Sequence, residues 1–176
     1  YAYGAGLSWC VEANKQMKIT EVLDAHAFKD RAGVMGRIAY DLGNAYKVTG
    51  VIIPNNSILH RLLLNPEMDL DGYRKKGLTR AALQKTRDYI KRVIAPVDQA
   101  RMARADAELI KQEFRLAADM LEHACELGMA RLETPDGKIA SIPSRTRRRL
   151  AADLKRIIAE HRRQWLIRSR PGGLDD

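Results

Sequence analysis

The sequence has few of the residues on which several protein classes depend. Only two of its 176 residues are cysteine, and only 6% are aromatic. Two cysteines do not make a disulfide framework, which favours a reducing compartment. The longest runs of aliphatic residues, 51–53 and 62–64, hold three residues each, far short of the roughly 18–20 needed to cross a bilayer. We therefore expect a soluble, cytoplasmic protein, with export left open because a leader could precede residue 1.

Familiar catalytic and cofactor signatures are also missing. Gly4-x-Gly6 lacks the third glycine of the dinucleotide fingerprint, and the chain has no phosphate-binding glycine loop, serine elbow or Cys–His nucleophile pattern. No two histidines have the i, i+4 spacing of helical zinc motifs. The four histidines are His26, His60, His123 and His161. We expect no cofactor, no metal site and no catalytic residue in this chain.

Helix-forming residues dominate what is present. Much of the 45% hydrophobic fraction is Ala and Leu, accompanied by Lys, Arg, Glu and Gln, a mixture typical of long packed helices. Apolar residues at intervals of three and four predict three long helices, over residues 79–97, 105–132 and 144–167. Thr79 is the expected cap of the first, and Pro96 should bend or end it. Short polar connections predict an antiparallel bundle.

Shorter elements are expected before residue 66. Asp30 is the predicted cap of a helix that contains Gly36 and Gly43, two glycines on one face that suggest the close approach of another backbone. Thr20 should cap a short helix before it, and either Asn56 or Ser57 one that ends near Leu64. Residues 65–77 are interpreted as a loop because they hold Pro66, Gly72 and Gly77.

The first ten residues have the pattern of a strand. Small residues occupy every second position from Ala2 to Cys10, whereas Tyr3, Leu7 and Trp9 are large, and a period of two is typical of a strand. A lone strand leaves its backbone groups unpaired. We therefore predict that it is the last strand of a (β/α)8 barrel from a larger protein. This interpretation makes Cys10 a buried free thiol, as is also expected of Cys125 in the second long helix.

Trp9 and Glu12 are the candidate substrate-binding residues. Trp9 would lie at the C-terminal end of the strand, where barrels of this class carry their sites. Its indole offers an apolar face for a sugar ring, and Glu12 could accept a hydroxyl proton. The alternative is that Trp9 packs outward into the helical layer and Glu12 is solvated; the alternation alone does not decide between them.

The net charge of +9 is concentrated in one helix. Residues 145–170 contain ten basic and two acidic residues, a charge of +8, and the other 150 residues carry +1. Such a helix could hold a phosphate backbone, but its only aromatic residue is Trp165 and base-reading residues are absent. We favour a solvated face or a surface that docks onto an acidic neighbour.

Three segments resemble the C-terminal part of bacterial family-20-type glycoside hydrolases, which are similar to β-N-acetylhexosaminidases. They are residues 3–14 (YGAGLSWCVEAN), 30–44 (DRAGVMGRIAYDLGN) and 165–174 (WLIRSRPGGL). The resemblance implies a TIM-barrel catalytic domain followed by helices, with the Asp–Glu dyad of that family on an earlier strand that this chain lacks. No catalytic residue is therefore carried over, and this portion alone should hydrolyse nothing.

These observations predict a mostly α chain in three parts: a last barrel strand and helix (residues 1–18), short bridging helices (19–65) and a long-helix bundle (66–176). The expected function is that of a structural C-terminal accessory domain of a carbohydrate-active hydrolase. Its partners would be the absent catalytic domain and, through the parent enzyme, carbohydrate; a homo-oligomer is left open, and membrane and nucleic acid are not favoured. The alternative is a stand-alone helical interaction module whose basic helix binds an acidic protein or nucleic acid.

Overall fold

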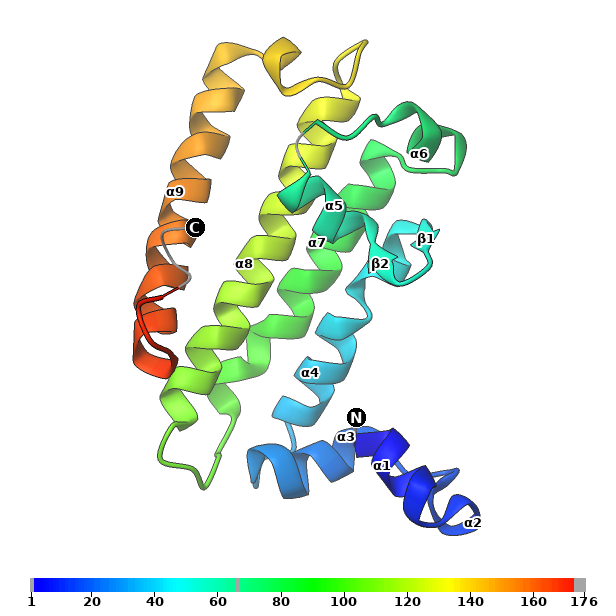
Figure 1. The fold of residues 1–176 in the computed structure, drawn as a ribbon, viewed down its shortest axis with the longest axis vertical. Helices are drawn as coiled ribbons and strands as arrows, with labels where there is room; N and C mark the ends of the chain where they lie inside the picture. The colour runs from blue at the N-terminus through cyan, green and yellow to red at the C-terminus, as the bar shows by residue number, and fades with distance from the viewer. Residues whose placement is uncertain (1, 66, 173–176) are drawn as a thin grey trace.

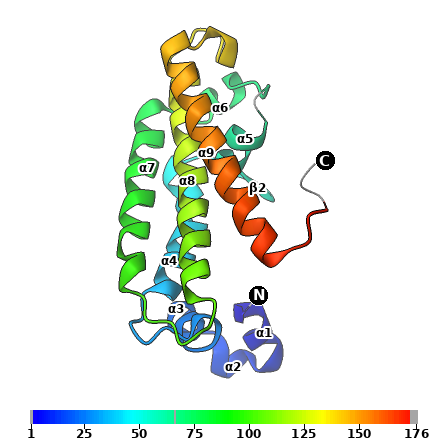
Figure 2. The same ribbon diagram turned by 90° about the vertical axis from the view of Figure 1, so that its left-hand side faces the viewer.

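Four helices that run alternately up and down form the body of the protein (Figure 1). The computed structural model describes residues 2–65 and 67–172. Figure 2 shows α7 and α9 on either side of α8. The predicted mostly helical, antiparallel arrangement is confirmed. The four helices are α4 (Met35–Gly43), α7 (Arg80–Ile94), α8 (Ala107–Leu132) and α9 (Ser144–Arg168).

The ends of these helices follow from local chemistry. The Thr79 hydroxyl oxygen accepts a hydrogen bond from the Ala82 N–H at 3.1 Å and so satisfies a donor at the start of α7. Pro96 has no N–H to continue the ladder, and the helix gives way to a 3₁₀ segment, Ala95–Gln99. Both predictions for this helix are confirmed. The predicted second and third long helices correspond to α8 and α9 within two residues at each end.

Shorter elements precede and connect the long helices. They are α1 (Ala2–Trp9), α2 (Val11–Asn14), α3 (Ile19–Val22), a π-helical segment (Leu23–Phe28), 3₁₀ segments (Ala45–Thr49 and Ile139–Ser141), α5 (Ile58–Leu64) and α6 (Asp71–Lys75). Thr20 lies inside α3 rather than at its cap, and α6 occupies part of the stretch predicted as a loop. Pro66 of that stretch lies outside the described residues. Within the described residues, no helix combines the length and the apolar character that a membrane crossing requires.

A small hairpin, absent from the sequence prediction, leads into α5. Strand β1 (Ile52–Ile53) pairs antiparallel with β2 (Asn56–Ser57). Asn55, with φ of 56°, makes the tight turn between them. The Ser57 hydroxyl accepts a hydrogen bond from the His60 N–H at 3.0 Å, which confirms the predicted cap of α5.

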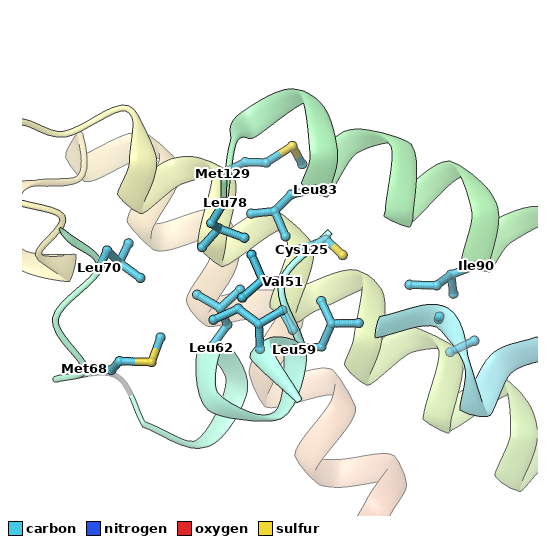
Figure 3. Close-up of a cluster of buried hydrophobic side chains, with 14 of the residues drawn as sticks. Val51, Leu59, Leu62, Met68, Leu70, Leu78, Leu83, Ile90, Cys125 and Met129 are labelled. Atoms are coloured by element: carbon cyan, nitrogen blue, oxygen red, sulfur yellow. The ribbon is translucent and has the colours of Figure 1, made fainter. Parts of the chain in front are cut away.

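The main hydrophobic cluster lies between α5, α7 and α8 (Figure 3). Leu62, Leu83 and Cys125 are fully buried there, so the prediction of a buried Cys125 is confirmed. A Cβ on Gly128 of α8 would come within 2.8 Å of Leu83 and Leu62, so this glycine lets three helices meet closely. The cluster contains residues of both the predicted bridging helices (19–65) and the predicted bundle (66–176), so the two parts share one hydrophobic core.

The start of α4 is held by two buried carboxylates. Val34 rather than Asp30 occupies the cap position of α4, but the Asp30 carboxylate accepts hydrogen bonds from the Val34 and Met35 N–H groups, and Asp24 accepts one from the Gly36 N–H at 2.6 Å. A Cβ on Gly36 would lie 2.0 Å from the Thr20 carbonyl oxygen of α3. The predicted close approach of another backbone is therefore correct at Gly36, although nothing lies within 4 Å of a Cβ on Gly43, the second glycine of the pair.

The predicted opening strand is wrong, and with it the structural argument for a barrel fragment at residues 1–18. Residues 2–9 form helix α1, whose backbone groups are paired within the segment and need no neighbouring strand. The small residues serve a different purpose: a Cβ on Gly6 would lie 2.3 Å from Met17 Cε, so glycine lets the chain fold back on α1. The Asn14 side-chain amide holds this fold by donating to the Gly6 and Cys10 carbonyl oxygens, both at 2.9 Å. Cys10 is exposed, contrary to the prediction.

Candidate functional site

Helix α9 is the outermost helix of the bundle and packs chiefly on α8. Its buried residues are Leu150, Ile157 and Gln164, spaced seven apart. Such a spacing makes a narrow seam against a single antiparallel neighbour. Most of the surface of α9 is therefore exposed, and three different stripes follow its length.

The first stripe is a ladder of polar pairs with α8. It repeats every seven residues along both helices and joins Arg149 to Glu126, Arg156 to Asp119 and Arg163 to Gln112. The Arg156–Asp119 contact is 2.8 Å and the Arg163–Gln112 contact is 2.7 Å. Glu126 also accepts from Arg87 of α7 at 2.6 Å, so its carboxylate connects three helices.

A buried His–Asp pair lies beside this ladder. His123 Nδ1 of α8 is 2.8 Å from Asp153 Oδ2 of α9, and His123 is 3% exposed. Burial by itself would raise the pKa of Asp153, but hydrogen bonds from His123 and Arg156 outweigh it and lower that pKa. Among the described residues no group of His, Cys, Asp and Glu could hold a metal ion. Because His123 lies on α8 and Asp153 on α9, their contact stabilises the packing of the two helices.

The second stripe is the outer, basic side of α9. Arg145, Arg148 and Lys155 are exposed. Across the part of the chain that the structure describes, none of the three forms an ion pair. The positive charge of residues 145–170 thus divides into arginines that bind acidic or amide groups of α8 and an outer stripe that faces solvent. We call Arg145, Arg148 and Lys155 the outer basic stripe.

The third stripe is apolar and faces a groove along α8. Leu154, Ile158, His161 and Trp165 follow one another at intervals of three and four. Ile158 is 57% exposed and Trp165 is 37% exposed. His161 and Trp165 line a depression of about 420 Å³ whose floor includes Met120.

A larger depression, of about 740 Å³, adjoins the first along the same side of α8. Ala117 and Met120 line both, so the two make one continuous surface, which we call the α8 groove. Its far wall comes from α4, the 3₁₀ segment Ala45–Thr49, the hairpin and α5. The residues of that wall include Leu42, Tyr46, Ile53, His60 and Leu63.

Trp9 and Glu12, the sequence-predicted site residues, lie on the N-terminal helices and not in the α8 groove. Trp9 ends α1 and is 90% exposed, so the alternative in which it packs into a helical layer is wrong. Glu12 of α2 is solvated and forms an ion pair with Lys15 at 2.6 Å. Neither α1 nor α2 has a buried residue. The Trp9 indole is therefore open to solvent, and the described residues form no pocket around it like the one expected at the C-terminal end of a barrel strand.

The three segments of the family resemblance have distinct positions. Residues 3–14 form α1 and α2, and residues 30–44 contain Asp30 and α4. Residues 165–172 end α9 and turn back, where the Trp165 indole N–H donates to the Arg170 carbonyl oxygen at 3.0 Å. Gly173 and Leu174 of the third segment lie outside the described residues.

Sequence reasoning did not identify the α8 groove. Phe114, Ala117 and Leu121 belong to the apolar repeat that predicts a helix over residues 105–132, and the spacing of such a repeat is the same whether the side chains are covered or open. The exposed Ile158 and Trp165 were the available signal, because they extend the apolar surface of α9 beyond its buried seam. Comparison of the chain with protein-family models, with curated proteins and with solved structures found no match.

Proposed function

We propose that this chain is a non-catalytic helical domain that binds an acidic polypeptide through α9. The observation that carries the proposal is the outer basic stripe, Arg145, Arg148 and Lys155, which has no ion pair within the described residues. Like charges on one side of a helix repel each other, and an acidic partner relieves that repulsion. The ladder, formed by other arginines of α9, keeps the helix in place while Arg145, Arg148 and Lys155 stay accessible.

A polypeptide is favoured over nucleic acid by two observations. Arg149, Arg156 and Arg168 already bind carboxylates of other elements, so the charge left for a phosphate backbone is smaller than the sequence alone indicates. Proteins that bind single strands combine basic residues with aromatic side chains on which bases stack. The outer side of α9 presents no aromatic residue next to Arg148 or Lys155.

Retention on immobilised poly-L-glutamate tests the proposal. The chain should be retained at low salt and released as NaCl screens the contact. The triple variant Arg145→Gln, Arg148→Gln, Lys155→Gln should elute markedly earlier. A control with the same change in net charge, Lys75→Gln, Lys85→Gln, Arg92→Gln, replaces exposed bases of α6 and α7 and should elute near the wild type. Equal elution of the two triple variants would contradict a specific role for α9, and stronger retention on a duplex oligonucleotide column would favour nucleic acid.

A second candidate is an accessory domain of a carbohydrate-active glycoside hydrolase. Its support is the family resemblance of three segments together with the 90% exposure of Trp9, an indole face open to a sugar ring. The catalytic domain would be its partner, and the chain alone would hydrolyse nothing.

Tryptophan fluorescence tests this second candidate, because the chain has two tryptophans, Trp9 and Trp165. In the Trp165→Phe variant the remaining signal comes from Trp9 and should change saturably with N-acetylglucosamine. The Trp9→Phe variant is the matched control and should not respond. Glu12→Gln should weaken the response, whereas Glu21→Gln on α3 should leave it intact. No response from Trp9, or the same response from Trp165, would count against sugar binding.

A further inference from the structure

We infer that the α8 groove receives an acidic amphipathic helix of the partner polypeptide. The inference rests on the proposed binding of an acidic polypeptide and adds to it the shape of the partner and the surface that it occupies. Three features carry it: an apolar floor, two walls of different character, and a basic margin on one wall only.

The floor is a side of α8 that other elements of this chain cover only in part: Phe114, for example, packs against Phe28 but keeps some of its surface exposed. Phe114, Ala117, Met120 and Leu121 line the groove, and each is partly exposed rather than buried. These residues recur at intervals of three and four, so their side chains form a ridge parallel to the helix axis. A partner helix can pack its own apolar ridge against such a surface, as helices in bundles do.

The walls stand on either side of this floor. One wall is α9 with His161 and Trp165. The other is formed by α4, the 3₁₀ segment after it with Tyr46, the hairpin, and α5 with Leu63. Figure 2 shows α5 and the lower end of α9 on the same side of α8, opposite α7. Among the described residues, large exposed apolar side chains occur on α1, α2, α4, β1, α5 and α9 and not on α7 or α8, and Trp165 is the one of them that lines the groove.

The charges in and beside the groove indicate which composition the partner helix should have. The groove lining carries one ion pair, Glu113 with Arg168, and further polar side chains stand on its walls, whereas the α8 residues of its floor are apolar and favour apolar side chains. The polar wall residues are Asn55, Asn56, Ser57, His60, His161, Gln164 and Ser169. Of the outer basic stripe, Lys155 lies level with the groove, because its neighbour Arg156 pairs with Asp119 of α8, the residue next to Met120. Arg148 lies about 10 Å further along α9, beyond the residues that line the groove. A helix with leucine-like residues at i, i+3, i+4 and i+7 and with Glu or Asp on the flank toward α9 matches both surfaces.

Two synthetic peptides test the inference directly. Both carry leucine on one helical face; one has glutamate on its flanks and the other has lysine at the same positions. In the Trp9→Phe variant, emission from Trp165 in the groove wall reports binding. We expect the glutamate peptide to bind saturably in the micromolar range and the lysine peptide to bind at least about tenfold more weakly.

Variants of the groove and of the stripe separate the two proposals. Ala117→Leu fills the groove floor and Met120→Glu places a carboxylate there, so each should weaken the glutamate peptide about tenfold. Ala81→Leu on the exposed side of α7 is the control for added bulk, and thermal melts followed by circular dichroism verify folding. Arg148→Glu with Lys155→Glu should weaken binding, whereas Lys85→Glu should not.

Each outcome has a distinct meaning. Binding that depends on Arg148 and Lys155 but not on Ala117 or Met120 would contradict the α8 groove as the binding site, whereas the proposed binding of an acidic polypeptide through α9 would still hold. Binding that depends on neither set, or no saturation up to ~1 mM peptide, would overturn both. A concentration-dependent dimer that Met120→Glu abolishes would identify a second copy of this chain as the occupant and overturn the partner helix.

Discussion

Arg156 of α9 and Asp119 of α8 form an ion pair in which Nη1 lies 2.8 Å from Oδ2. The same geometry recurs seven residues away in both directions along α9, with Glu126 and Gln112 as the partners from α8. Part of the positive charge of α9 is thus balanced by carboxylates of α8, which recur at the same interval of seven residues as the arginines. This ladder sets the register of α9 and leaves its other two stripes available to a partner.

Reversing one charge of the ladder should destabilise the protein modestly. Arg156→Glu would put a carboxylate beside Asp119 and Asp153, and we expect a loss of about 1 kcal/mol in the free energy of unfolding at low salt. Adding Asp119→Arg to this variant should recover part of the loss, with a coupling of about 0.5 kcal/mol. Urea unfolding measures both. Lys18→Glu, which disrupts the exposed pair with Glu21, is the control, and no recovery in the double variant would contradict the ladder.

The two glycines of α4 should respond to alanine in opposite directions. Gly36→Ala would place a Cβ 2.0 Å from the Thr20 carbonyl oxygen, so α3 and α4 must separate, and we expect a loss of about 1–3 kcal/mol. Gly43→Ala adds a Cβ with nothing within 4 Å and should stabilise by roughly 0.5–1 kcal/mol, because alanine loses less backbone entropy in a helix. Chemical unfolding compares the two variants, and equal effects would show that α3 does not approach α4 this closely.

The Asp30 carboxylate should make stability depend on acid pH. Burial alone would raise its pKa, but hydrogen bonds from the N–H groups of Val34, Arg101, Met35 and Ala32 together lower that pKa below its usual value of 3.8. Because the pKa is lower in the folded state, the stabilisation is present above the unfolded pKa and is lost as the pH falls through the folded value.

Melting temperatures of the wild type and Asp30→Asn over acid pH test this prediction. The variant should be less stable near pH 7, and the difference between the two proteins should shrink as the pH falls below about 4. The Asp88→Asn variant removes an exposed carboxylate of α7 and is the control. A difference between wild type and Asp30→Asn that does not change with pH would contradict the assignment.

The two cysteines should differ sharply toward alkylation. Burial raises the pKa of the Cys125 thiol to about 12, so almost no thiolate exists there at neutral pH, whereas Cys10 is exposed. Iodoacetamide should modify Cys10 alone in the folded protein and both cysteines in concentrated urea, as peptide mass spectrometry would show. Protection of Cys10 in the folded protein would instead support a buried opening segment.

The sequence by itself determined the parts of this protein that depend on local interactions. Thr79 and Ser57 accept hydrogen bonds from N–H groups three residues on, and Pro96 cannot donate to a helix ladder, so these residues act within a few positions of the chain. The long helices could be predicted for the same reason, since an apolar residue every three or four positions suits a helix with one buried side.

Only the tertiary structure decided the opening segment and the candidate site. The alternation from Ala2 to Cys10 fits a strand, but Gly6 and Asn14 allow the chain to fold back on a helix, a contact that a period of two cannot reveal. The α8 groove likewise depends on which sides of the helices meet. An apolar stripe on α8 predicts burial, yet α9 contacts α8 through a narrow seam and leaves Met120 and Trp165 accessible, because packing between helices is set by three-dimensional contacts and not by the sequence of any one of them.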